Sequence, residues 1–365
     1  MKRIIIGIVA LVMALSSTGC GEAKSSSEVD NSRIENSKTS SDSEAVLDTS
    51  SEEESSRDNE PQLNNSKVIA SGDCGEKGDN VKWKLHEDGL LVIEGSGKMK
   101  DYPINRGAIG GGWGSSSNEM YTTPWKDYNE RIKSVVVSEG VSYIGTCSFA
   151  GSNVESIKLP DSLESISFHF GVLDCLSTLR IPKGVKRIGI DGDRDIYGLF
   201  QNANLENIKV DEENEYFSSV DGVLYNKDKT ILLSCPPKKS EVVIPYGVKT
   251  IGAYAFKGCE KISTIELPVS IVSIEAYAFA NCTELTDINI QYGTQTIGEQ
   301  AFERSTKITS IIIPSSVTSI GAAAFSDGLG PLETTDHERI TIWCNSDSYA
   351  EKYAKEHHLK YEYIG

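Results

Sequence analysis

The chain has 365 residues, with 53 acidic against 36 basic side chains and a formal net charge of −17. This balance argues against nucleic-acid binding, because a phosphate backbone needs clustered lysine and arginine, and against purely electrostatic adsorption to an anionic membrane. The sequence holds only five histidines, so a catalytic centre or hydrolytic zinc site would have few candidates to draw on. We therefore expect a non-enzymatic protein without a metal or other cofactor.

Residues 1–19 are typical of a signal peptide. A short basic start is followed by an apolar run from Ile4 to Leu15, which has about the length of a signal-peptide core and is short for a membrane span. Gly19 then precedes Cys20, which resembles a bacterial lipobox, although Ser17 stands where leucine is usual. The resemblance implies cleavage before Cys20 and lipid on that residue. An ordinary secretory signal that happens to hold a cysteine is the alternative.

Residues 20–67 have the composition of a tether. From residue 21 onward this segment contains 13 serines, 12 acids, 5 basic residues and no aromatic residue. Such a segment buries too little apolar surface to offset the entropy of ordering it. We expect a disordered linker that holds a folded domain about 35–40 Å or more from a membrane.

An internal repeat of 23 residues begins near Val242. The unit reads L-x-x-I-x-I-P-x-x-V-x-x-I-G-x-x-A-F-x-x-C, a spacing typical of leucine-rich repeats. Three of its positions recur as Pro245, Pro268, Gln291 and Pro314; as Ile251, Ile274, Ile297 and Ile320; and as Ala255-Phe256, Ala278-Phe279, Ala301-Phe302 and Ala324-Phe325.

Fainter copies of the unit extend upstream, so we place the repeat array at residues 131–338. A β-hairpin near residues 216–235 is inserted into one unit. We expect an N-terminal cap over residues 68–130, with a hairpin at 81–95. A C-terminal cap over residues 339–365 should hold a helix and a closing strand.

Each repeat predicts one coil of a solenoid. The I-x-I segment alternates like a short strand, and the Ala-Phe pair sits on a helical turn that plugs the coil. One coil cannot bury these side chains alone, so the coils should stack about 4.8 Å apart. The cysteine that ends the unit falls at an inward corner, as a buried thiol in Cys259 and Cys282. A disulfide between these two is geometrically possible.

These motifs resemble BspA-type leucine-rich-repeat surface proteins. The resemblance covers about residues 70–365 and includes the Trp83 hairpin, Pro124-Trp125, the repeat units and the Ser348–Ala354 ending. It implies a horseshoe of short parallel strands with short helical turns, an N-terminal hairpin cap and a C-terminal helical cap. It also implies an extracytoplasmic, lipid-anchored location. Some members of the family bind host proteins such as fibronectin or fibrinogen, and no catalytic residues belong to the repeat.

The outward residue of each strand is the candidate binding position, because solenoids present extended surfaces to partners. In successive coils this position holds Val136, Lys158, Arg180, Lys209, Val243, Glu266, Asn289, Ile312 and Thr341. Lys158, Arg180 and Lys209 form a stripe that suits an acidic patch of a partner, while Glu266 and Asn289 offer polar contacts. Solvated strand residues without a binding role are the alternative.

Two functions stay open at this stage. The first is adhesion, or binding of an extracellular or host protein. The second is binding of a carbohydrate or cell-wall component, in which Trp113, in a Gly-rich loop, would take part. Asp191, Asp193 and Asp195 match the start of a calcium loop, but Ile196 and Asn202 break the pattern, so a solvated acidic turn is the better interpretation. The acidic run 211–215 is interpreted as a loop on the rim.

Overall fold

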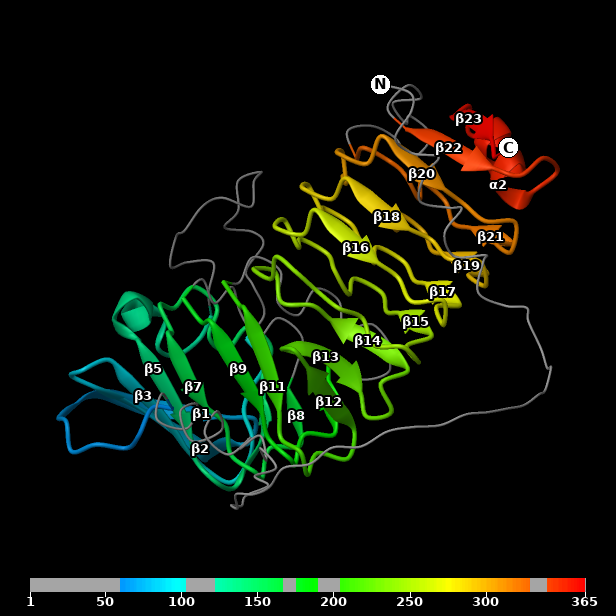
Figure 1. Cartoon of the computed structure of the whole chain (residues 1–365). Coiled ribbons are helices and arrows are strands. Elements are labelled where there is room, and N and C mark those ends of the chain that lie inside the picture. The colour runs from blue at the N-terminus through cyan, green and yellow to red at the C-terminus, as the bar shows by residue number, and fades with distance from the viewer. Residues whose placement is uncertain (1–59, 103–121, 167–174, 190–203, 329–339, 365) are drawn as a thin grey trace, which may run out of the picture. The chain divides into compact units, whose positions relative to one another are not determined.

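The structure is a computed structural model that describes residues 60–102, 122–166, 175–189, 204–328 and 340–364. All of these belong to one compact unit. Short strands dominate this part of the chain, and they lie side by side in chain order (Figure 1). Each coil of the repeat contributes a strand to each of two parallel ladders.

The first ladder contains the I-x-I segments. It is divided into groups that are hydrogen-bonded internally and parallel throughout. The groups are β3 (Leu90–Gly95), β5 (Ser134–Val137) and β7 (Ser156–Lys158); β9 (Thr178–Ile181) and β11 (Asn207–Val210); β16 (Thr264–Glu266) and β18 (Asp287–Asn289); and β20 (Ser310–Ile312), β22 (Thr341–Cys344) and β23 (Lys360–Tyr363).

The second ladder lies on another side of the coils. It is formed by short segments in which an apolar residue stands next to a turn. The I-G motifs supply its regular members, because the isoleucine points inward and bonds its equivalent one coil away. Its strands are β4 (Gly97–Lys98), β6 (Val141–Ile144), β8 (Ser165–Ile166) and β10 (Arg187–Ile188), and then β14 (Ile231–Ser234), β15 (Thr250–Ile251), β17 (Ser273–Ile274), β19 (Thr296–Ile297) and β21 (Ser319–Ile320).

From the sequence we expected the Ala-Phe segments to form helical turns, and only part of their backbone bonding is of that kind. Along Tyr254–Cys259 the backbone amides alternate: those of Tyr254, Phe256 and Gly258 donate to carbonyls of the next coil, and the amides between them donate three residues back. A helix would keep these bonds within one coil. The alternation requires a positive φ of 61° at Tyr254, and the equivalent Tyr277 and Gln300 have the same conformation.

Antiparallel strands occur at the start of the folded part and within the array. The hairpin expected at residues 81–95 is formed by β2 (Gly78–His86) and β3, with β1 (Val68–Gly75) on its outer edge. The inserted hairpin is formed by β13 (Val223–Asn226) and β14, and β12 (Phe217–Val220) pairs with β13. A 3₁₀ helix, η5 (Lys126–Arg131), precedes β5. The helix α2 (Tyr349–Glu356) lies between β22 and β23 in the sequence. Of the helices in the described ranges, none is long and apolar enough to cross a membrane.

A column of stacked aromatic rings runs through the core of the regular coils. Phe256, Phe279, Phe302 and Phe325 are all at most 2% exposed, with neighbouring ring centroids 4.9, 5.4 and 5.5 Å apart. Tyr353 of α2 meets Phe325 edge-on, and its hydroxyl accepts a bond from the Ala324 amide. The phase of the 23-residue repeat is therefore confirmed.

Truncating one ring of this column tests how much the stack stabilises the fold. We expect Phe279→Ala to lower the free energy of unfolding by about 3–5 kcal/mol, as for other buried aromatic truncations. Because solenoid stability is close to a sum of coil and interface contributions, the loss can also split the unfolding transition. Tyr292→Ala, on an exposed aromatic residue of the next coil, is the matched control and should change the midpoint of denaturation little. Equal midpoints for the two variants would contradict the role of the stack.

Glu351 ties α2 to the last strand. Its carboxylate accepts bonds from Lys355 (2.6 Å), the Tyr363 hydroxyl (2.7 Å) and the Asp347 amide (2.6 Å). These contacts, that of Lys355 first, lower the pKa of Glu351 to about 2, and the Glu351 carboxylate in turn raises the pKa of Tyr363 to about 12. The charged form of Glu351 is therefore favoured in the folded chain.

A lowered folded-state pKa predicts stability that is present above the unfolded pKa of about 4.3 and is lost as the pH falls towards 2. We expect Glu351→Gln to destabilise the chain at pH 7, and the difference from wild type to shrink steadily below pH 4. Thermal unfolding followed between pH 7 and pH 2 measures this difference. A difference that stays constant over the whole range would show that Glu351 acts through packing alone.

Candidate binding face

The outward side chains of the first ladder form one surface, which we call the strand face. Lys158, Arg180, Lys209, Glu266 and Asn289 lie on it, as strand alternation predicts. Arg180 pairs in register with Lys209, and Glu266 with Asn289. Lys209, Glu266 and Asn289 are exposed, whereas Lys158 and Arg180 are half-buried. The outward positions are confirmed, and a role in binding stays a prediction.

Two of the three cations of the strand face, Lys158 and Arg180, lie close to carboxylates of the chain itself. Arg180 donates to Asp211 at 3.1 Å, and both Arg180 and Lys158 approach the carboxylate of Glu60, at 4.0 and 3.9 Å. The acidic run 211–215 therefore reaches this cation. From the sequence we expected only a loop on the rim there. These carboxylates reduce the repulsion between Lys158 and Arg180.

Val136 points outward but is not exposed. It is only 5% exposed and packs with Leu90 and Val92, which are outward residues of the neighbouring strand β3. These three form a small apolar cluster separate from the two main cores. The strand face is thus apolar at its first coils and cationic at the next ones.

The far end of the strand face presents a second apolar pair, which sequence reasoning missed in part. Ile312 is 52% exposed, and its partner in register is the half-buried Trp343. Thr341, which we aligned with Ile312, pairs with Ser310 instead. The alternation of buried Ile340, Ile342 and Cys344 was the signal for an outward Trp343.

A second exposed column lies at the turn after each strand. Tyr246, Val269 and Tyr292 stand one repeat apart and are 82%, 62% and 75% exposed. Tyr254 and Tyr277 lie in the Ala-Phe segments of successive coils. Their ring centroids are 4.8 Å apart, and the ammonium group of Lys257 lies over both rings. Burial lowers the pKa of Lys257. In the sequence, Tyr246 and Tyr292 are two repeats apart and Tyr254 and Tyr277 are one repeat apart. We did not include any of these tyrosines among the candidate residues.

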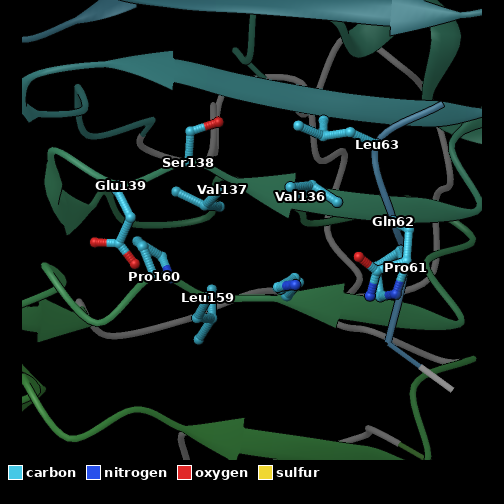
Figure 2. A pocket seen from close by; sticks show the side chains of 10 residues that line it. Pro61, Gln62, Leu63, Val136, Val137, Ser138, Glu139, Leu159 and Pro160 are labelled. Atoms are coloured by element: carbon cyan, nitrogen blue, oxygen red, sulfur yellow. The ribbon is translucent and has the colours of Figure 1, made fainter. Parts of the chain in front are cut away.

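Beside the apolar end of the strand face is an open pocket of about 330 Å³ (Figure 2). Val136, Val137, Leu159 and Pro160 supply its apolar wall, and Lys158 lies at its edge. The segment that precedes β1 forms the opposite wall. The lining residues there are Pro61, Gln62 and Leu63.

Three sequence candidates lie outside the described residues: Cys20, Trp113 and the aspartates 191, 193 and 195. Within the described residues, no three His, Cys, Asp or Glu side chains gather as metal ligands. Cys259 and Cys282 are free thiols, both buried, so the possible disulfide between them is not formed. The pKa of Cys259 is raised well above its usual value by its contact with Cys235 and by burial, and burial does the same to Cys282. Neither thiol is therefore poised as a nucleophile.

Comparison with known families gives the class of the protein. The model of the BspA type leucine rich repeat region matches six copies over residues 127–220 and 233–345, which is more than half of the chain. The chain belongs to the BspA-type leucine-rich-repeat family. A comparison with curated proteins found no match.

Solved structures share the fold at low sequence identity. The pneumococcal vaccine antigen PcpA is 18% identical, with a TM-score of 0.50 over 82% of this chain and 100% of that one. A leucine rich cell surface protein from Faecalibacterium prausnitzii is 19% identical, with a TM-score of 0.49 over 78% and 93%. A leucine-rich repeat protein from Eubacterium ventriosum is 23% identical, with a TM-score of 0.42 over 76% and 73%. At such identities the likeness to PcpA supports the fold alone.

Proposed function

We propose that this is a non-enzymatic, lipid-anchored cell-surface protein that binds an extracellular protein through the strand face. One observation carries the proposal. The inward positions of the coils are nearly uniform and form two large apolar cores, while the outward positions in register with one another change from apolar to cationic, then to polar, then to apolar. A graded surface on a regular scaffold is what a repeat protein offers to a macromolecular partner.

A role in binding also fits the family and the thiol chemistry. Repeat proteins of this kind act as binding modules, and BspA-type members are surface proteins. The buried thiols of the coils have raised pKa values, which favours a packing role for them over a nucleophilic one. In this proposal the N-terminal hairpin and the C-terminal helix with its strand cap the two ends of the array.

A carbohydrate or cell-wall ligand is the second candidate. Tyr246 and Tyr292 favour it, because two largely exposed aromatic rings two coils apart offer flat apolar surfaces with a polar edge. Replacing both with alanine should abolish retention of the chain on immobilised wall polysaccharide. Unchanged retention would remove this surface from consideration.

The strand face is tested by charge reversal. The variant Lys158→Glu/Arg180→Glu/Lys209→Glu should associate more slowly with a matrix protein such as fibronectin or fibrinogen, and it should lose most of the salt dependence of the association rate. The rate is measured by surface plasmon resonance at several salt concentrations. Reversal of three exposed lysines away from the strand face, Lys77, Lys229 and Lys261, is the control of equal charge change. If both variants associate at the same rate, the cations of the strand face do not guide the partner.

The anchor is tested at Cys20. We propose that Cys20 carries lipid, supported by the apolar segment before it, by Gly19 and by the Ser-rich, acidic segment behind it. Metabolic labelling with a fatty-acid probe should mark the wild-type protein in the membrane fraction, and Cys20→Ala should abolish both label and membrane retention. A Cys20→Ala protein that keeps its label would contradict the anchor.

A further inference from the structure

Residues 60–67, which the sequence analysis assigned to the tether, contact the folded part of the chain. The side chain of Asn64 donates to Asp88 at 2.5 Å, and the carbonyl of Ser66 lies 2.7 Å from Nδ1 of His86. The carbonyl of Lys67 accepts a bond from the Glu87 amide. These contacts fix the segment at the turn between β2 and β3, directly beside the first strands of the strand face.

The chain before Asn64 then crosses the strand face. Figure 2 shows Pro61, Gln62 and Leu63 running across the strands, with Leu63 next to Val136. Proline at position 61 fixes φ at a value that suits an extended, polyproline-like backbone. The segment thereby forms one wall of the pocket whose other wall is the apolar side of β5 and β7.

The carboxylate of Glu60 lies next to two cations of the strand face. Its carboxylate lies between Lys158 at 3.9 Å and Arg180 at 4.0 Å. An acidic residue and, three residues later, a leucine thus meet two features of the strand face, the cation pair and the apolar pocket wall. Each contact of the segment has a chemical counterpart on the strand face.

The fit of the segment is incomplete. Leu63 is still 64% exposed, the pocket beside it is open, and the two ion-pair distances are long. Partly solvated ion pairs at such long distances stabilise only weakly. A segment held so weakly owes its position mainly to its covalent attachment, which gives a short tether an effective concentration in the millimolar range.

We propose that the β5, β7 and β9 end of the strand face is a peptide-binding groove, and that residues 60–63 occupy it in cis. The ligand that it fits is an extended peptide of a protein partner, with an acidic residue and a large apolar residue three positions later. This inference rests on the proposed function, for which it names the ligand chemistry. A partner peptide with a better-filling apolar residue displaces the segment from the pocket.

The test uses the full mature chain and a fluorescent synthetic peptide with the sequence of residues 57–66. In the variant Glu60→Lys/Leu63→Ser the groove is free, so this chain should bind the peptide at least about tenfold more tightly than wild type, in which the cis segment competes. Adding Lys158→Gln and Arg180→Gln should abolish the binding. Fluorescence anisotropy at low salt measures the affinities, and circular dichroism verifies the fold of each variant.

Glu76→Lys is the matched control, since it makes the same charge change on the exposed β1–β2 turn. This chain should behave as wild type. Equal peptide affinity for wild type and the opened variant, or peptide binding that survives Lys158→Gln/Arg180→Gln, would overturn the proposal.

The same variants separate this proposal from the proposed function. If matrix proteins do not bind but the opened chain takes the peptide, the groove stands and the choice of partner is wrong. If matrix proteins bind and the opened chain ignores the peptide, the strand face acts through other residues, and the groove is wrong.

Discussion

The structure depends on coil-to-coil stacking. In the described regular coils, Phe279 is stacked between Phe256 and Phe302 of the adjacent coils. The same contact aligns the backbone, because the amides of Tyr254, Phe256 and Gly258 reach the next coil from alternate residues of one segment. Ring stacking and backbone bonding therefore require the same register, and a shift of one residue would destroy both.

Serine side chains add a third constraint to this register. Ser270 donates to the Val248 carbonyl and accepts from the Gly247 amide, and Ser316 makes the same two contacts with Thr294 and Gly293. The glycines have positive φ, at 105° and 113°, which makes their amides available to the next coil. A regular register of this kind leaves the outward strand positions free to vary. The strand face is thus a consequence of the packing on the opposite side of the same strands.

The sequence was sufficient for what depends on periodicity. The 23-residue period located the stacked rings, and alternation located Lys158, Arg180, Lys209, Glu266 and Asn289 on one face. The backbone conformation of the Ala-Phe segments could not be predicted from the sequence, because a pattern of buried residues does not give the sign of φ at Tyr254. Trp343 was missed as the partner of Ile312 because the spacing between β20 and β22 departs from 23 residues. The pairing of Arg180 with Asp211 joins residues of two coils through a loop, which no local pattern reports.

Electrostatics explain why the cations of the strand face are partly covered. On a chain with a net charge of −17, a pair of neighbouring cations is the natural position for the chain's own carboxylates. Asp211 forms an ion pair with Arg180, and Glu60 approaches both Arg180 and Lys158. The first contact is short and comes from the adjoining coil, whereas the second is long and comes from a segment that precedes the first strand. In the proposed groove, an incoming acidic group would displace Glu60 before Asp211, and Asp211 would stay to orient the guanidinium of Arg180. Selectivity of that groove would come from the apolar wall next to the cations, since any carboxylate could replace Glu60 but only one followed by an apolar side chain would also fill the pocket beside Val136.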